Sequence, residues 1–270
     1  MADEPHSRER RGARSSAALR FNWNRMAELD APGYIARRPG SAMPPWDKAE
    51  FLAGGRAIVE ACAARVRELG GELRGASALD FGCGVGRMSG ALLERYDQYV
   101  GVDVAEAMLA RTGEFASSPR ATFVHSPRGD LAPLGGRRFD LVWSYVTLQH
   151  VPPDDAERLL GELAASVAEG GWLCVQVPVR SASDLERIFG RATWKGRLRS
   201  AVPLAWLERW RAWRNDGPRC DMFGLAPDVV TASVRAAGLE LRGSDVVDDT
   251  LGLVESRRYF ATRPAASAVR

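Results

Sequence analysis

The sequence lacks long hydrophobic runs, and it has no pair of closely spaced cysteines. Its apolar stretches, such as residues 172–175, fall far short of the ~20 residues that a membrane-spanning helix needs. Residues 1–20 are rich in Arg, Ser and Ala and contain no apolar segment typical of secretory signals, so we expect a disordered leader in a cytoplasmic protein. The four cysteines include no Cys-x-x-Cys pair, which argues against a zinc site or a disulfide framework.

The sequence also has little excess charge and no internal repeat. A net charge of +3 is too small to indicate a nucleic-acid partner by itself. With 46% apolar and 26% charged residues, the composition is that of an ordinary globular protein. A length of 270 residues is enough for one large α/β domain with an insertion, or for two small domains.

Short apolar segments alternate with helical segments from residue 76 onward. The alternation predicts a parallel sheet with helices on both faces, within an α/β domain over residues 71–263. A helix near the middle of this domain is expected to stop at Gly170 and Gly171. The expected strands are at 76–80, 99–103, 122–125, 139–144, 172–177, 239–247 and 254–262, and the expected helices are near 87–96, 106–115, 154–169 and 227–237.

A helical extension is expected before the first strand, over residues 21–70. Asp47 is placed to cap its longer helix. The aromatic residues Trp23, Tyr34 and Trp46 have two interpretations: they pack on the domain, or they fold over a binding site as a lid.

An insertion rich in Arg and Trp follows the fifth expected strand, over residues 180–222. Trp206, Trp210 and Trp213 fall on one helical stripe, which favours packing on the chain's own domain or on a second copy in a homodimer. A pocket for an anionic substrate is one alternative, and contact with nucleic acid or a membrane surface is the other. The tail, 264–270, is expected to be disordered.

The first expected strand ends in Asp80 and leads into Gly82, Gly84 and Gly86 before a helix. Glycines let the backbone turn sharply and let a ligand approach main-chain atoms, and the helix that follows offers unpaired N–H groups. A dinucleotide fingerprint would need glycine where Arg87 stands, and no Gly-Lys-Ser/Thr follows as a P-loop requires. The turn therefore indicates a nucleotide-type cofactor of another kind.

A second acidic residue, Asp103, closes the second expected strand about twenty residues later, where its carboxylate can accept both hydroxyls of a ribose. Two carboxylates suit a cofactor with a ribose and a positively charged amino-acid end better than one with a pyrophosphate.

Four segments, in order along the chain, resemble the motifs of class I S-adenosylmethionine (SAM)-dependent methyltransferases. They are residues 78–87, residues 100–109, residues 139–152, and Gly170-Gly171-Trp172 at the fifth strand. The resemblance covers residues 76–179 well and the last two strands loosely. It implies a Rossmann-like, seven-stranded, mostly parallel sheet and SAM as the cofactor.

The resemblance also implies roles for individual residues. Asp80 and the glycine backbone would hold the methionine end, Asp103 the ribose, and Val104 and Met108 the faces of the adenine. The acidic contact to the adenine amino group has no direct counterpart, because the loop length favours Arg128 or Gly129 over Asp130. The expected cofactor-binding set is Asp80, Gly82, Gly84, Gly86, Asp103, Val104, Met108, Arg128, Gly129 and Ser144.

Methyl transfer from a sulfonium is an in-line displacement, so holding the reactants collinear and excluding water does most of the work. A general base helps when the nucleophile is a hydroxyl, and His150, just past the fourth strand, is the candidate. The alternative is that Gln149 and His150 only orient the loop. Tyr145 is the second catalytic candidate, which could line the pocket or touch the cofactor, and the alternative is ordinary packing. No metal site is expected.

These features favour an O- or N-methyltransferase of specialised metabolism that acts on a small molecule. The segment 144–147 is not the Asn/Asp-Pro-Pro-Tyr/Phe of nucleobase-amino methyltransferases, which disfavours RNA or DNA as substrate. Two alternatives share the same cofactor site. One is an enzyme that transfers or cyclises the aminocarboxypropyl group and releases methylthioadenosine, and the other is a SAM-binding regulator without catalysis.

Overall fold

A computed structural model of the chain describes residues 4–36, 47–179, 222–247 and 255–265. It contains one seven-stranded sheet in the order β3-β2-β1-β4-β5-β7-β6. The pairings from β3 to β5 are parallel, and β7 is antiparallel to both of its neighbours. The predicted mostly parallel α/β fold is therefore confirmed. In the described part of the chain, no helix is both long enough and apolar enough to cross a membrane.

The strands alternate with helices as the sequence pattern predicts. Their bounds are β1 Gly75–Phe81, β2 Tyr96–Asp103, β3 Ala121–His125, β4 Phe139–Ser144, β5 Val167–Pro178, β6 Glu240–Val247 and β7 Ser256–Thr262. The helices and 3-10 turns are α1 Glu4–Ala36, α2 Lys48–Glu68, α3 Ser89–Leu93, α4 Glu106–Leu109, α5 Thr112–Phe115, η1 Ala132–Leu134, η2 Leu148–His150, α6 Pro153–Ala165 and α10 Pro227–Ala236.

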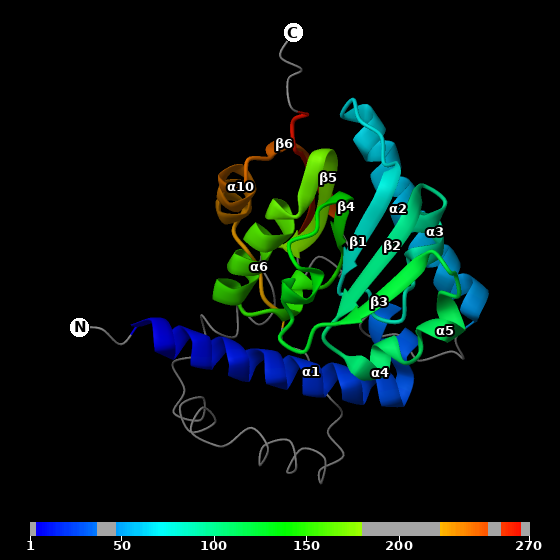
Figure 1. The fold of residues 1–270 in the computed structure, drawn as a ribbon, viewed down its shortest axis with the longest axis vertical. Coiled ribbons are helices and arrows are strands. Elements are labelled where there is room, and N and C mark those ends of the chain that lie inside the picture. The colour runs from blue at the N-terminus through cyan, green and yellow to red at the C-terminus, as the bar shows by residue number, and fades with distance from the viewer. Residues whose placement is uncertain (1–3, 37–46, 180–221, 248–254, 266–270) are drawn as a thin grey trace.

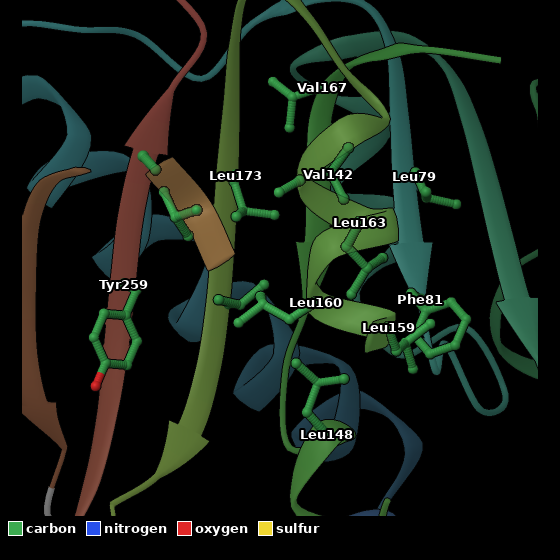
Figure 2. Packing of buried hydrophobic residues seen from close by; sticks show 14 of the residues in the cluster. Leu79, Phe81, Val142, Leu148, Leu159, Leu160, Leu163, Val167, Leu173 and Tyr259 are labelled. Carbon is green, nitrogen blue, oxygen red and sulfur yellow. The ribbon is translucent and has the colours of Figure 1, made fainter. Parts of the chain in front are cut away.

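Two hydrophobic layers cover the faces of the sheet. Helices α6 and α10 pack on one face, where Leu159, Leu160 and Leu163 point from α6 toward the strands (Figure 2). Helices α2 and α3 pack on the other face, against side chains such as Trp143 of β4. The leucines of α6 recur at helical spacing, so a single apolar stripe meets the sheet.

The first helix includes residues 4–20, most of the segment 1–20 that was expected to be a disordered leader. Helix α1 spans Glu4–Ala36 and runs past the carboxyl ends of β1, β2 and β3 (Figure 1). This segment is rich in Arg, Ala and Glu, which favour helix, and its later part gains apolar packing around Met26 and Ala27. A kink at Asp30 precedes Pro32, where the Asp30 carboxylate accepts a hydrogen bond from the Gly33 N–H at 3.1 Å.

Three expected helices are shorter than the sequence pattern indicates. The segment expected as a helix over 87–96 holds only α3, because β2 already begins at Tyr96. The segment expected over 106–115 divides into α4 and α5, where the Thr112 hydroxyl donates to the Leu109 carbonyl at 2.8 Å. Helix α6 ends at Ala165, not at Glu169.

Gly170 and Gly171 lie inside β5 and do not terminate a helix, contrary to the prediction. Gly170 has a φ of 72°, and a Cβ at Gly171 would lie 2.9 Å from the carbonyl oxygens of Ala168 and Asp140. Glycine is needed here because the backbones of β4 and β5 approach closely at a shift in strand register.

Several predictions lie outside the described residues. They concern Trp46, the insertion up to residue 221 with its tryptophan stripe, and the tail beyond residue 265.

Candidate functional site

The turn after β1 brings the backbone close to two neighbouring loops. Gly82, Gly84 and Gly86 all have left-handed φ angles, of 79°, 55° and 81°. A Cβ at Gly82 would collide with the side chain of Thr147, which follows β4. Only glycine serves at such a position, because other residues rarely adopt this φ and a side chain would have no room. The three glycines thus allow the backbone of this turn to lie in direct contact with its neighbours, such as the Thr147 side chain.

Asp103 ties this turn to the loop after β2. Its carboxylate accepts hydrogen bonds from the Gly84 N–H and the Ala105 N–H, both at 2.8 Å. Burial raises the pKa of Asp103, and the N–H groups of Ala105 and Gly84 oppose the shift. Asp103 is half-buried at the end of β2, so the carboxylate both orders the two turns and reaches the space between them.

A cavity of about 480 Å³ opens at this carboxyl edge, next to the switch point between β1 and β4. Ligands of open α/β sheets bind at such switch points, and a volume of this size accommodates a drug-sized molecule. The wall contains eight of the twelve residues that the sequence predicted for the site: Gly82, Gly84, Asp103, Val104, Met108, Gly129, Tyr145 and His150.

Three predicted residues lie off this wall, and two of them, Ser144 and Gly86, support it from behind. The Ser144 hydroxyl is buried and donates to the Phe81 carbonyl at 3.1 Å. The Gly86 N–H donates to the Cys83 carbonyl within the turn at 2.9 Å. Arg128 is exposed, and its guanidinium pairs with Asp130 at 2.8 Å. The structure therefore brings Gly129, and not Arg128, to the cavity.

Asp80, the fourth residue off the wall, is buried beneath the turn. The Tyr99 hydroxyl donates to its carboxylate at 2.8 Å. Burial raises the pKa of Asp80 to about 7; the Tyr99 hydrogen bond opposes this shift and the charge of Asp103 adds to it. Asp80 thus lies off the cavity wall and supports the glycine turn from below.

The raised pKa predicts that Asp80→Asn stabilises the cofactor-free protein at alkaline pH. Because the folded-state pKa of about 7 exceeds the ordinary value of 3.8, the folded protein binds this proton more tightly than the unfolded chain. The contribution of this proton to the free energy of unfolding is complete below pH 4. It falls as the pH rises to about 7 and is absent above that pH. Asparagine still accepts the Tyr99 hydrogen bond and carries no charge.

Denaturant unfolding at pH 4, 6 and 8 measures this effect. The advantage of Asp80→Asn over the wild type should be near zero at pH 4 and reach as much as about 4 kcal/mol at pH 8. Asp97→Asn, at an exposed position of β2, is the matched control and should show no such trend. A difference that does not change between pH 4 and pH 8 would contradict the buried carboxylate.

Helix α1 closes one side of the cavity. Leu19, Trp23 and Met26 line it at helical spacing, and Tyr34 and Ile35 line it beyond the kink. Trp23 and Tyr34 were candidates for a lid, whereas Leu19, Met26 and Ile35 were missed, although the spacing of 19, 23 and 26 carries the signal.

Two hydrogen bonds fasten α1 to the loop after β2. The Asn24 side-chain oxygen accepts from the Ala107 N–H at 2.9 Å, at the start of α4. The Arg111 guanidinium donates to the Ala27 carbonyl at 3.1 Å. Since α4 also carries Met108 of the cavity wall, α1 and this wall are held as one unit.

The loop after β4 carries His150 and an unusual backbone conformation. Val146 has a φ of 59°, which a β-branched residue rarely adopts. Its N–H donates to the buried Gln176 side-chain oxygen at 3.1 Å, and the Gln176 amide donates to the Ser256 hydroxyl. This strained point positions the residues that follow it along the cavity wall.

His150 faces the cavity between two neighbours. Its ring meets the Trp23 ring edge-on, with centroids 5.2 Å apart. The Gln149 amide nitrogen lies 3.2 Å from His150 Nε2, so this contact favours the tautomer in which Nε2 is an acceptor. In this tautomer Nδ1 carries the proton, so His150 can accept a proton from a bound molecule at Nε2 only when that molecule displaces the Gln149 contact.

The comparisons with known proteins agree with this architecture. A family model described as a methyltransferase domain matches residues 78–171. The ubiquinone biosynthesis O-methyltransferase of Bordetella avium is 32% identical over 181 residues, which cover 66% of this chain and 68% of that protein. The chain belongs to the class I SAM-dependent methyltransferases.

Two further likenesses concern this family of methyltransferases. The trans-aconitate 2-methyltransferase of Deinococcus radiodurans is 34% identical over 142 residues, which cover 48% of this chain, so the match spans about half of that protein (52%). The crystal structure of a Synechocystis magnesium protoporphyrin IX methyltransferase covers 92% of this chain and 99% of its own, with a TM-score of 0.61 and 19% identity, a likeness of fold.

The residues present fit SAM, the cofactor of this family. The backbone of Gly82 and Gly84 lies on the cavity wall, and only glycine fits at Gly84, since a Cβ there would lie 2.9 Å from Ile35 Cδ1. The Asp103 carboxylate stands at the same wall, and Val104 and Met108 offer apolar surface beside it. A ribose acceptor, an apolar slot and a backbone without side chains at the wall are what a nucleoside with an amino-acid arm requires.

Proposed function

We propose that this methyltransferase transfers the methyl group of SAM to a hydroxyl or carboxyl oxygen of a small molecule. The observation that carries the proposal is that one cavity has the glycine turn and Asp103 on its wall together with His150. Two relatives support a small-molecule acceptor, since their names refer to trans-aconitate and to O-methylation in ubiquinone biosynthesis. A nitrogen acceptor is the alternative form of the same proposal.

In this proposal the chain's own residues bind, orient and shield the reactants. Asp103 accepts the ribose hydroxyls, Val104 and Met108 contact the adenine, and the backbone of Gly82 and Gly84 lies along the amino-acid arm. When bound, SAM supplies an activated methyl group on a sulfonium. His150 accepts the proton that a hydroxyl acceptor loses, and α1 excludes water from the cavity.

Product analysis separates this function from its two alternatives. The purified protein is incubated with SAM, alone and with trans-aconitate, a catechol or an aromatic amine, and the adenosine products are identified by mass spectrometry. Methyl transfer yields S-adenosylhomocysteine only when an acceptor is present. Methylthioadenosine would instead indicate aminocarboxypropyl chemistry, and SAM binding without any product across a broad acceptor panel would indicate a regulator.

The position of α1 predicts that its aromatic wall contributes to cofactor affinity. Trp23→Ala removes a half-buried ring from the cavity and should weaken S-adenosylhomocysteine binding about tenfold, from lost apolar burial. Phe21→Ala, on the exposed side of the same helix, is the matched control and should bind normally. Isothermal titration calorimetry measures both affinities. Equal affinities for the two variants would show that α1 packs beside the site without covering it.

A further inference from the structure

Arg87 directly follows the glycine turn and lies half-buried between the cavity and α2. Its Nε–H donates to the Phe51 carbonyl at 3.0 Å, and its guanidinium carbon is 5.0 Å from the centre of the Phe51 ring. Burial lowers the pKa of Arg87, which shows that the surroundings penalise its charge. An arginine stays charged in proteins, so this cation is held in a partly desolvated place.

Several other arginines of the described chain have carboxylate partners, whereas Arg87, like Arg67 and Arg263, donates to a backbone carbonyl instead. Arg56 pairs with Glu94, Arg95 with Glu60 and Arg111 with Glu114. Around Arg87, no carboxylate of the described residues lies within ion-pair distance. A desolvated charge without a counter-ion is unfavourable, and a ligand anion removes the penalty.

The neighbouring helix is shaped around this guanidinium. Two consecutive glycines, Gly54 and Gly55, stand in the interior of α2, where glycine weakens a helix. A Cβ at Gly54 would collide with Arg87 Nη2, and a Cβ at Gly55 would lie 2.7 Å from the Arg87 carbonyl oxygen. The chain thus accepts a weaker helix at the place where Arg87 needs room.

Arg87 and Tyr145 both line the cavity. Asp103, the carboxylate of the wall, already accepts two backbone N–H groups. A ligand carboxylate is the anion that the planar fork of a guanidinium binds best, through two parallel hydrogen bonds.

We propose that Arg87, beside Tyr145, binds a carboxylate group of a molecule in the cavity. The inference rests on the proposed function, because it assumes that cofactor and acceptor share this cavity. The carboxylate has two sources, the amino-acid arm of the cofactor or the acceptor substrate. Either source makes Arg87 a specificity-determining residue of the site.

Binding measurements test this subsite without turnover. Trans-aconitate, a tricarboxylate, is titrated into protein loaded with methylthioadenosine, which lacks the amino-acid carboxylate, and into protein loaded with S-adenosylhomocysteine, which has it. Arg87→Met should weaken the carboxylate-dependent affinity about 10- to 100-fold, as expected when hydrogen bonds to a charged group are lost. Arg87→Lys keeps the positive charge but lacks the planar guanidinium. Its affinity for the carboxylate should lie between the affinities of the wild type and of Arg87→Met.

The pattern of binding identifies the source. Arginine-dependent binding of trans-aconitate to both loaded forms assigns the acceptor carboxylate. Two results assign the cofactor carboxylate. One is that trans-aconitate binds only the methylthioadenosine-loaded protein. The other is that Arg87→Met binds S-adenosylhomocysteine more weakly than the wild type but binds methylthioadenosine equally well. If Arg87→Met matches the wild type for trans-aconitate and S-adenosylhomocysteine, the subsite is refuted; failure of the wild type to bind S-adenosylhomocysteine would refute the proposed function instead.

A second variant guards against misfolding of Arg87→Met. Gly54→Ala keeps the charge but crowds the guanidinium, and alanine favours the helix. It should therefore keep or raise the melting temperature while weakening the same carboxylate-dependent binding. If Arg87→Met does not fold, unchanged carboxylate-dependent binding by Gly54→Ala overturns the proposal.

Discussion

Asp103→Ala should weaken S-adenosylhomocysteine binding by about 100-fold or more. The side chain is placed at the cavity wall, where it can accept ribose hydroxyls, and hydrogen bonds to a charged group contribute about 1.5–3 kcal/mol each. It also accepts the Gly84 and Ala105 N–H groups at 2.8 Å, so its loss leaves both turns without their shared acceptor. Asp103→Ala therefore loses both the hydrogen bonds to the ribose and the acceptor that orders the two turns.

Isothermal titration calorimetry with S-adenosylhomocysteine measures this loss, and two further variants separate its causes. Asp97→Ala removes the same type of side chain from the exposed, opposite end of β2 and should bind normally. Asp103→Asn keeps a neutral acceptor for the turns and should show an intermediate loss. If Asp103→Ala binds as tightly as Asp97→Ala, the ribose does not lie at the end of β2.

The sequence could predict Asp103 because its place depends on a rule of the fold. The carboxyl ends of parallel strands meet at one edge of the sheet, so a carboxylate that closes β2 must stand near the turn that closes β1. Val104 and Met108 follow directly and reach the same wall. Local pattern and sheet topology were sufficient for Asp103, whereas Val104 and Met108 were expected from the family resemblance.

Asp80 shows a constraint that the motif alone does not give. Side chains alternate between the faces of a strand, so Leu79 and Phe81 point toward α6 while Asp80 points to the opposite layer and Tyr99. The motif resemblance gave Asp80 a role at the cofactor, but the strand period directs its carboxylate into the interior. A check of alternation along β1 would have found this.

The contribution of α1 could not be derived from local pattern alone. Whether an amphipathic helix docks on its own domain depends on contacts with distant residues, here from Asn24 and Ala27 to the region of α4. The left-handed φ of Val146 was likewise beyond prediction, because valine disfavours it and only the buried Gln176 makes it stable. Arg87 was used to exclude a dinucleotide motif, and its place in the cavity appeared only in three dimensions.

Replacing His150 should lower turnover by about 100- to 10,000-fold with a hydroxyl acceptor, the range that general base catalysis supplies. His150→Phe keeps a ring in contact with Trp23 but has no nitrogen to accept a proton. The affinity for S-adenosylhomocysteine should stay within about twofold of the wild type, because the variant leaves the expected cofactor contacts at Asp103 and Gly84 unchanged.

The kinetic pattern decides between a base and a residue that only orients the loop. If His150 accepts the proton, His150→Phe lowers kcat and leaves KM for the acceptor nearly unchanged, since the lost interaction forms in the transition state. His150→Gln, which can hydrogen-bond but cannot take up a proton, should then be as slow as His150→Phe. If the ring only orients the loop through Gln149, whose amide nitrogen lies 3.2 Å away, glutamine should restore much of the turnover. An acceptor that ionises without help, such as a carboxylate, should be methylated almost as fast by either variant as by the wild type, so the dependence on acceptor acidity identifies the proton transfer itself.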